Sequence, residues 1–553
     1  MSSNVSQALP PALTCFLAAI LLLSSCTPKP ASPTPRYAVA RFENLSGDPT
    51  LDWVARAATE YFSATLSKAL DGPVLSSASL NRAGPGISDD RAKAQIVGAN
   101  HLISGYLERV NGQLRLYAVD EDLATGKDTR QISVEANQPV HAMNDLVHAF
   151  SPSAAPYLTS NPETLKLYAT AFDEPIDHAV TDLREATNTD PNFGPAWILL
   201  IDAASRRGDR EALAKTIDEA LNQKLAPLEK AQIRLEKTLL ENDKTASLAA
   251  MRDLSAQSPA DLVLLKSLAE SDTAAANFKQ AANEWKKIRE AVPTDRDAWN
   301  QLGYNLAWSG DLAGALDTMK QYGAHWPDDP NPIDSLGDVN YMYGKFADAA
   351  ALYLKADRKN SKLLNGGDLY KAAWAYFKAG DKSKADAAFA QFRAARTKTN
   401  PEAFTPFEAD WLYRTGRAKE AIALLRKDDT GWSQLVIWDL LAHDRAAAAK
   451  DAAAAKDAIT RFAALPSASV AEWQTRAGNG TEPARRLALG IALLLDGKTD
   501  AARPVWDKIV EDSSGTDFLS RAIDAKLKGE KPKLEQIPDS LQVNPLASIP
   551  DKF

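Results

Sequence analysis

Few residues of this chain stand in patterns that perform chemistry. Its Gly-Lys pairs begin at Gly126, Gly344 and Gly497, and none has the glycine five residues earlier that a phosphate-binding loop requires. No histidine opens the His-Glu-x-x-His pattern of a helical zinc site, and no Gly-x-Ser-x-Gly nucleophile turn occurs. The sequence therefore predicts a protein that is not an enzyme and binds no cofactor.

Metal ions and nucleic acids are also disfavoured as ligands. His141 and His148 fall on one face of a helix, but two turns separate them by roughly 10 Å, which is too far for one metal ion. The formal net charge is -8, and the basic residues form neither a stripe nor an alternation with aromatic residues. We expect surface histidines, no metal site and no nucleic-acid partner.

Aromatic residues at helical spacing are the best candidates for binding. Tyr370, Trp374 and Phe377 stand at i, i+4 and i+7, which places them on one helix face. Large exposed apolar strips are typical of partner sites, so we expect a protein or peptide to bind here. The predicted binding residues are Tyr304, Trp308, Asp334, Asp338, Tyr341, Tyr370, Trp374, Phe377 and Arg414. In the alternative interpretation these rings pack against neighbouring helices.

The elements that position these residues recur every 34 residues. The period is marked by prolines at multiples of 34, namely Pro191, Pro259, Pro293 and Pro327. After Pro293, a first apolar stripe consists of Trp299, Leu302 and Leu306 at helical spacing. Gly310 then allows the chain to leave that helix, and a second helical pattern follows. One period therefore predicts two short helices joined by a turn.

These units resemble the tetratricopeptide repeat family in period and in their alternation of large and small residues, such as Trp299 with Gly303 and Ala315. Six units run in register from about residue 160, and weaker copies follow. The resemblance implies an all-α superhelix with a regular array at 158–399 and divergent repeats at 400–528. Its concave face would be lined by the first helix of each unit. Asn300 and Tyr304 do not reproduce the carboxylate clamp of chaperone-binding members, so a chaperone-tail receptor is disfavoured.

The amino terminus predicts export and lipidation. Leu13–Leu23 is an apolar run too short to span a bilayer, and it leads into Leu23-Ser24-Ser25-Cys26. This resembles the bacterial lipobox, which implies that residues 1–25 are a signal peptide and that Cys26 is acylated. No Lys or Arg precedes the run, which departs from the usual pattern. Thr27 in place of Asp implies sorting to the outer membrane.

A separate domain is predicted between this leader and the repeats. Residues 26–36 are rich in proline and predict an extended tether. Within 37–139, strands are expected at 37–42, 73–76, 102–110, 113–120 and 129–136, and helices at 49–70 and 89–97. Asn111-Gly112 predicts a tight hairpin between the third and fourth strands. The order of these elements predicts a small α+β domain.

This domain resembles the TolB-like domain of FlgO-type flagellar lipoproteins. The similarity is carried by residues 38–49, by 102–107, and by the segments 117–120 and 124–127. It implies a binding or assembly module of the envelope. The alternative is that Asn44 and Asp48 only form a turn and cap a helix.

Together these features predict a lipid-anchored envelope scaffold, on the periplasmic face of the outer membrane, that binds proteins or peptides through the concave face. Its only link to the membrane would be the lipid, and residues 529–553 would form an extended tail. One alternative is an enzymatic or glycan-binding accessory of envelope polymer assembly with a site between the domains. Another is a sensory module. The sequence leaves the oligomeric state open.

Overall fold

The computed structural model describes residues 35–66, 74–75, 80, 87–152, 159, 161–259, 261–362, 364–399, 404–456, 458–465, 471–472, 475 and 483–552. The predicted signal peptide, Cys26 and the tether up to residue 34 lie outside these residues. The chain divides into two compact units, one of residues 1–237 with 258–261 and the other of 238–257 with 262–553.

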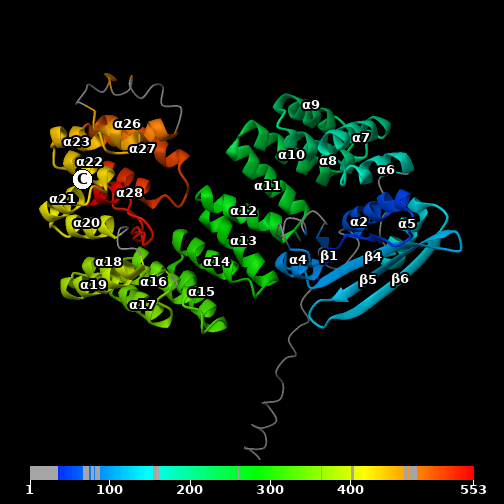
Figure 1. The fold of residues 1–553 in the computed structure, drawn as a ribbon, viewed down its shortest axis with the longest axis horizontal. Helices are drawn as coiled ribbons and strands as arrows, with labels where there is room; N and C mark the ends of the chain where they lie inside the picture. The colour runs from blue at the N-terminus through cyan, green and yellow to red at the C-terminus, as the bar shows by residue number, and fades with distance from the viewer. Residues whose placement is uncertain are drawn as a thin grey trace, which may run out of the picture. The chain divides into compact units, whose positions relative to one another are not determined.

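The first unit begins with an α+β domain (Figure 1). Its elements are β1 (Tyr37–Val39), β2 (Glu43–Asn44), a 3-10 turn at Pro49–Leu51, α2 (Asp52–Leu66), β3 (Val74–Leu75), α4 (Asp90–Ile96), β4 (His101–Val110), β5 (Gln113–Asp122), β6 (Lys127–Ala136) and α5 (Pro139–Phe150). The sheet has the order β3-β1-β4-β5-β6, and β2 pairs with β4. Strands β1, β2 and β3 make parallel pairs, whereas β4, β5 and β6 form an antiparallel meander.

Local sequence explains both the hairpin and an early strand end. Asn111 and Gly112 have φ angles of 52° and 81°, as a two-residue hairpin turn requires, so the predicted hairpin is confirmed. The predicted strand at 37–42 instead stops at Val39. The Phe42 N–H donates to the Thr59 hydroxyl at 2.9 Å, which ties the chain to α2 instead of extending the ladder.

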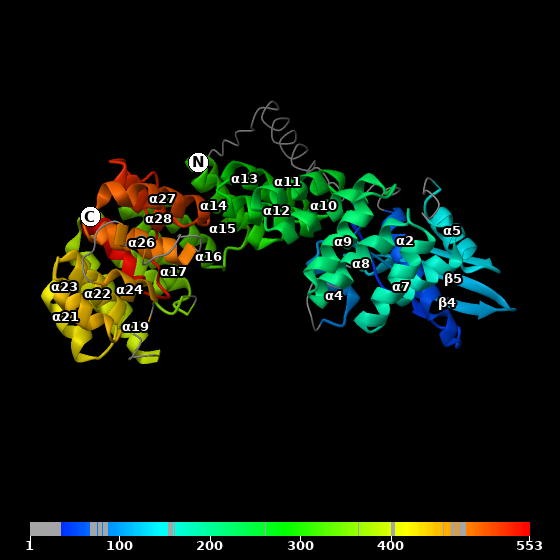
Figure 2. The same cartoon turned by 90° about the horizontal axis from the view of Figure 1, so that it is seen from above.

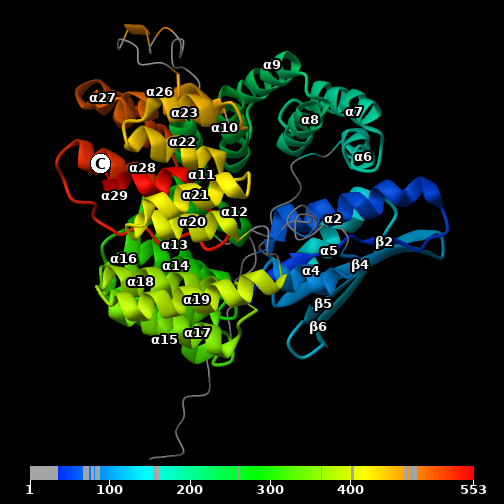
Figure 3. The same ribbon diagram turned by 60° about the vertical axis from the view of Figure 1, so that its left-hand side comes forward.

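Helices α2 and α5 cover one face of the sheet (Figure 3). Helix α5 begins at Pro139, where the predicted domain of residues 37–139 ends. It packs on β5, β6 and α2 through an apolar stripe. The members of that stripe are Ala142, Met143, Leu146, Val147 and Phe150. His141 and His148 are exposed on the other side of the helix, as the sequence predicted.

The remaining chain consists of helix pairs (Figure 2). In the first unit these are α6 (Pro162–Thr170) with α7 (Ile176–Thr189) and α8 (Gly194–Arg207) with α9 (Arg210–Leu221). They continue as α10 (Pro227–Glu241) with α11 (Lys244–Gln257), α12 (Leu262–Ala274) with α13 (Phe278–Ala291), α14 (Arg296–Trp308) with α15 (Leu312–His325), and α16 (Asn331–Met342) with α17 (Phe346–Lys359). The first helices of these six pairs begin within two residues of positions 160, 194, 228, 262, 296 and 330, so the predicted register is confirmed.

Less regular pairs follow in the second unit. They are α18 (Gly367–Lys378) with α19 (Lys382–Thr399), α20 (Thr405–Arg414) with α21 (Ala418–Lys427), and α22 (Trp432–Leu441) with α23 (Arg445–Ala452). After α24 (Ala458–Ala463) come α26 (Pro483–Leu495), α27 (Thr499–Asp512), α28 (Phe518–Leu527), a 3-10 turn η2 (Pro545–Ser548) and α29 (Ile549–Lys552). The fold class is therefore the predicted one, an α+β domain followed by an all-α solenoid of tetratricopeptide type.

The end of the second unit returns to its beginning. The Gly515 N–H, in the loop after α27, donates to the Ala274 carbonyl at the end of α12 at 2.6 Å. A Cβ atom on Gly515 would lie 2.4 Å from the Thr273 carbonyl oxygen, so only glycine allows this approach. Phe518 of α28 also reaches Trp308 of α14, with 5.9 Å between ring centroids. Within the second unit, the region of α27 and α28 therefore packs back on α12 and α14.

Close packing between α16 and α17 requires a glycine at position 337, which can be tested by substitution. A Cβ atom there would lie 2.7 Å from Cε1 of the buried Tyr353 ring, so Gly337→Ala is expected to lower the free energy of unfolding by about 1–3 kcal/mol. Gly323→Ala is the matched control. Its Cβ would meet only Pro332 at 3.6 Å, so the higher helix propensity of alanine should leave stability unchanged or slightly raised. Equal denaturation midpoints for the two variants would contradict this account.

Candidate functional site

The predicted aromatic strip on α18 lies inside the helix stack. Trp374 is 1% exposed and Tyr370 is 3% exposed. Trp411 of α20 packs on Trp374 with ring centroids 4.8 Å apart, and the Arg414 guanidinium lies 4.2 Å from the centroid of the same ring. Phe377 is half-buried beside Trp374 at 5.7 Å. The prediction of an exposed strip is wrong, because the first helix of the following pair covers α18.

A second predicted pair of rings lies on α14, and Trp308 of this pair contacts Phe518 of α28. Tyr304 and Trp308 of α14 stack with centroids 5.4 Å apart, and both are half-buried. Phe278 of α13 contacts Trp308 at 5.4 Å, opposite the contact that Phe518 makes with it. Trp308 therefore joins α28 to α13 and α14.

The predicted acidic residues form a buried ion cluster with a lysine that the sequence analysis did not single out. Asp334 and Asp338 of α16 are 6% and 4% exposed. The Lys371 ammonium of α18 donates to Asp334 at 2.7 Å and to Asp338 at 2.9 Å. The Tyr304 and Tyr353 hydroxyls each donate to Asp338 at 2.8 Å. The cluster therefore links α14, α16, α17 and α18.

Burial sets the protonation states of this cluster. Burial first, and then a hydrogen bond with Asp334, raises the pKa of Asp368 to about 9. The pKa of Asp338 is raised by burial to about 6, with the charge of Asp334 adding to the effect and Lys371 opposing it. Burial alone would lower the pKa of Lys371, but the charges of Asp338 and Asp334 outweigh it and raise that pKa. At neutral pH the lysine is thus charged and Asp368 is protonated.

The C-terminal residues occupy the inner face of the array, which we define as the sides of α16, α18, α19, α20 and α22 that contact residues 534–549. Figure 1 draws this segment in red between α28 and α16. The Glu535 N–H donates to the Met342 carbonyl at the end of α16 at 2.9 Å. Arg396 of α19 donates to the Ser540 carbonyl at 2.7 Å, and the Trp438 indole of α22 donates to the Ser548 hydroxyl at 3.2 Å. The segment therefore contacts α16, α19 and α22 in the order in which these helices follow along the chain.

A cavity of about 350 Å³ remains between this segment and the array. Tyr341, Tyr370 and Arg414, all predicted binding residues, line it from the array side together with Asp410. Arg414 and the Tyr370 hydroxyl each approach the Asp410 carboxylate at 3.4 Å. The part of the chain that lines the other side includes Pro538, Gln542 and Val543. Three of the nine predicted residues thus face a cavity, which is covered by the protein's own chain.

The sequence predicted an extended tail at 529–553, but only residues 530–544 lack regular structure, because Pro545–Ser548 forms η2 and Ile549–Lys552 forms α29. Its prolines indicated an extended chain, whereas the signal for packing was the series of aliphatic residues between them. Leu534 and Ile537 pack against the cluster around Met342, and Val543 packs against the cluster around Trp374. Nothing in the linear spacing of these residues specifies which helices they meet.

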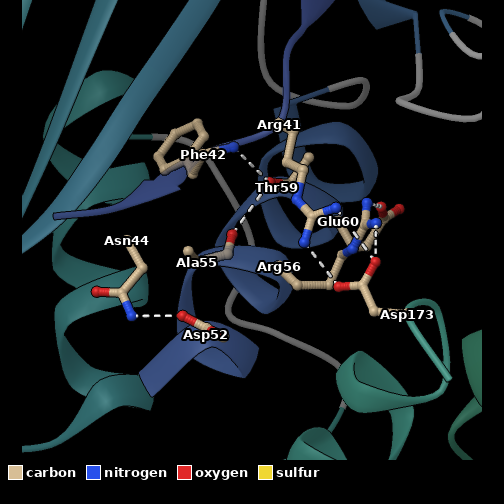
Figure 4. Close-up of polar contacts among 9 residues, drawn as sticks. All are labelled: Arg41, Phe42, Asn44, Asp52, Ala55, Arg56, Thr59, Glu60 and Asp173. Atoms are coloured by element: carbon tan, nitrogen blue, oxygen red, sulfur yellow. Dashed lines mark hydrogen bonds and ion pairs between the residues drawn. The ribbon is translucent and has the colours of Figure 1, made fainter. Parts of the chain in front are cut away.

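A further cavity, of about 560 Å³, lies beside β1, β2 and α2 in the first unit. Arg41 and Arg56 line it, and both bind Asp173 in the turn between α6 and α7, as Figure 4 shows. Partial burial alone would raise the pKa of Asp173, but hydrogen bonds and charges from Arg56 and Arg41 outweigh it and hold the pKa below its usual value. The pair of arginines therefore joins the α+β domain to the first helix pair.

Among the residues that the structure describes, no group of three or more His, Cys, Asp or Glu side chains is arranged to hold a metal ion. Within the same residues, no helix has both the length and the apolar composition needed to cross a bilayer. Cys26, the predicted lipidation site, lies outside this part of the chain.

No protein-family model matches the sequence. No curated protein matches it either. One similar solved structure is the C-terminal part of a TPR repeat-containing protein from Cytophaga hutchinsonii, with 14% identity over 43% of this chain and 94% of that one, at a TM-score of 0.33. Another is a tetratricopeptide repeat protein from Parabacteroides merdae, with 16% identity over 42% and 94% of the two chains and a TM-score of 0.28. The pilF protein of Pseudomonas aeruginosa is similar at 14% identity over 39% and 97%, with a TM-score of 0.25.

Loss of the buried lysine should be costly. Lys371→Met leaves the carboxylates of Asp334 and Asp338 buried without their cation, so we expect the free energy of unfolding to fall by about 3 kcal/mol. Lys355→Met, at an exposed position of α17, should change it by less than about 0.5 kcal/mol. Chemical denaturation of both variants at pH 7 measures the difference, and a similar small effect at both sites would refute the assigned role of Lys371.

The raised pKa of Asp368 predicts a pH dependence of stability. Between its ordinary value of 3.8 and about 9, the folded state holds a proton that the unfolded state releases, so this group makes the protein less stable as pH rises. Asp368→Asn keeps a hydrogen-bond donor but cannot ionise. We expect the free energy of unfolding of the variant, relative to that of the native chain, to rise by about 1–2 kcal/mol between pH 6 and pH 8, as measured by denaturation curves. Parallel pH profiles would show that Asp368 is ionised in the folded protein.

Proposed function

We propose that this chain is a non-catalytic scaffold of the cell envelope, anchored by a lipid on Cys26, that binds protein or peptide partners through the inner face of its helical array. The observation that carries the proposal is that this face already holds a segment of the same chain, residues 534–549, which has no helix or strand up to Asn544. A surface that receives one extended segment has the shape and the hydrogen-bonding groups to receive another.

The contacts on this face suit peptide recognition. Met342 accepts a hydrogen bond from a main-chain N–H, and Arg396 donates one to a main-chain carbonyl. Main-chain contacts of this kind hold an extended segment whatever its side chains, while apolar surface between the helices selects among sequences. Leu534 and Ile537 use that surface in the present structure.

The anchoring part of the proposal rests on the sequence of the leader. An apolar run followed by Leu23-Ser24-Ser25-Cys26 resembles a lipobox, and Thr27 supports transfer to the outer membrane. The proline-rich residues 27–35 would then extend roughly 30 Å and hold the folded body away from the lipid surface. On the same basis, the TolB-like domain would serve as an assembly module near the membrane.

An enzymatic or glycan-binding role has less support. The cavity beside Arg41 and Arg56 lies near the junction where such a site was expected, but both arginines are bound by Asp173. Ion pairing of this kind accounts for them as a structural link between the α+β domain and the first helix pair. No observation favours a second function over the scaffold.

Site-specific crosslinking in intact cells tests the scaffold function. A photoreactive residue replaces Lys378, which lies beside the inner face, or Lys355 of α17 as the control. We expect a protein adduct from position 378 and little or none from position 355.

Cys26→Ala should move the protein from the membrane fraction to the soluble fraction. Equal adducts from both positions, or membrane retention of the Cys26 variant, would count against the proposal.

A further inference from the structure

The segment on the inner face has two parts that are held differently. Its last residues are firmly packed, since Ser548 is 1% exposed and Ile549 is 0% exposed within the cluster around Trp438. The preceding stretch, residues 532–544, is held less closely. Leu534 and Ile537 are only half-buried, and Leu541 is 68% exposed.

The stretch 532–544 presents a recognisable chemical pattern to the array. Leu534 and Ile537 stand three residues apart and pack on the same apolar cluster. Between them, the Glu535 carboxylate lies 3.4 Å from the Lys378 ammonium of α18, and the Glu535 N–H bonds to the Met342 carbonyl. Proline follows directly at position 538. The inner face thus binds an extended segment that contains two aliphatic residues, an acidic residue and a proline.

This stretch does not fill its seat. The cavity of about 350 Å³ between it and the array is lined by residues that include Tyr370, Asp410 and Arg414. Lining atoms next to a cavity forgo the packing contacts that a tighter occupant would supply. Another peptide in the same track could add side-chain atoms there, so residues 532–544 leave room for a better-fitting ligand.

We propose that the inner face formed by α16, α18 and α20 binds in trans an extended, proline-containing peptide with two aliphatic residues flanking a carboxylate, and that residues 532–544 compete for this site as an intramolecular ligand. The inference rests on the proposed scaffold function and specifies the partner's chemistry and its regulation. The buried residues Ser548 and Ile549 retain the segment when the site is occupied by a partner.

Tethering explains why such a weak contact persists. A segment joined to its site by a short linker acts at an effective concentration on the order of 1 mM, so a free peptide must overcome this competition before it binds. Prolines at 532, 538 and 545 restrict the unbound chain and reduce the entropy lost on binding, for the tethered segment and for a similar free peptide alike.

Binding of a labelled synthetic peptide of residues 531–544 to the full chain tests the proposal. Ile537→Asp in the protein should release its own stretch, and Leu541→Asp at the exposed position is the matched control. We expect fluorescence anisotropy to show at least ten-fold tighter peptide binding by the Ile537 variant than by the native chain or the control. Circular dichroism and the unfolding midpoint establish that each variant is folded.

A charge exchange provides a second test that does not depend on Ile537. Lys378→Glu places a second negative charge beside Glu535, so it should repel Glu535 both in the tethered segment and in the native peptide. Both side chains are partly exposed, so the protein should tolerate the replacement. We expect this variant to bind a peptide carrying Glu535→Lys about three-fold more tightly than the native peptide. The Ile537→Asp variant, which retains Lys378, should instead prefer the native peptide.

The outcomes separate this inference from the scaffold function. Equal peptide affinity of the native chain and the folded Ile537 variant, or no charge preference, would overturn it, even if crosslinking at other positions still captures a partner. Concentration-dependent dimers of the native chain that disappear when the peptide is added would assign the site to a second copy of the chain and would also overturn the partner assignment.

Discussion

Burial of apolar surface between successive helix pairs is the interaction on which the rest of the second unit depends. A single pair cannot bury its own apolar face, so each is stable only against its neighbours. Trp374 illustrates this dependence, because it comes from α18 but is enclosed by Trp411 and Arg414 of α20. An open array would leave such faces exposed at its ends. Here the return of Gly515 to Ala274, and of Phe518 to Trp308, covers one end with the other.

Stacking of successive helices also brings polar groups together where they are buried and need partners. Lys371 satisfies Asp334 and Asp338, and the raised pKa of Asp368 keeps that carboxyl neutral in the same cluster. The ion cluster holds three helix pairs in one arrangement, since removal of any member leaves a buried charge or an unmet hydrogen bond. This rigid wall then offers Met342, Lys378 and Arg396 to an extended chain. Helices α16 and α18 thus carry both the buried ion cluster and contacts with the C-terminal segment.

The α+β domain joins the first helix pair through a smaller ion cluster. Arg56 is nearly buried in α2, and its charge is met by Asp173 between α6 and α7, with Arg41 donating to the same carboxylate from the sheet side. The Arg56 guanidinium also lies over the Phe172 ring, 5.0 Å from its centroid. Within the first unit, the domain and the first helix pair therefore form a continuous body.

The sequence by itself determined the elements that depend on neighbouring residues along the chain. The 34-residue register, the Asn111-Gly112 hairpin and the α+β order follow from helical or strand periodicity and from backbone preference, which are local properties. Only the tertiary structure decided whether an aromatic face is core or surface. Trp374 and Tyr370 have the spacing of an exposed strip, yet the position of α20, more than thirty residues away, buries them. The seat of residues 534–549 was likewise undetermined, because burial and ion pairing arise between segments whose separation no local pattern encodes.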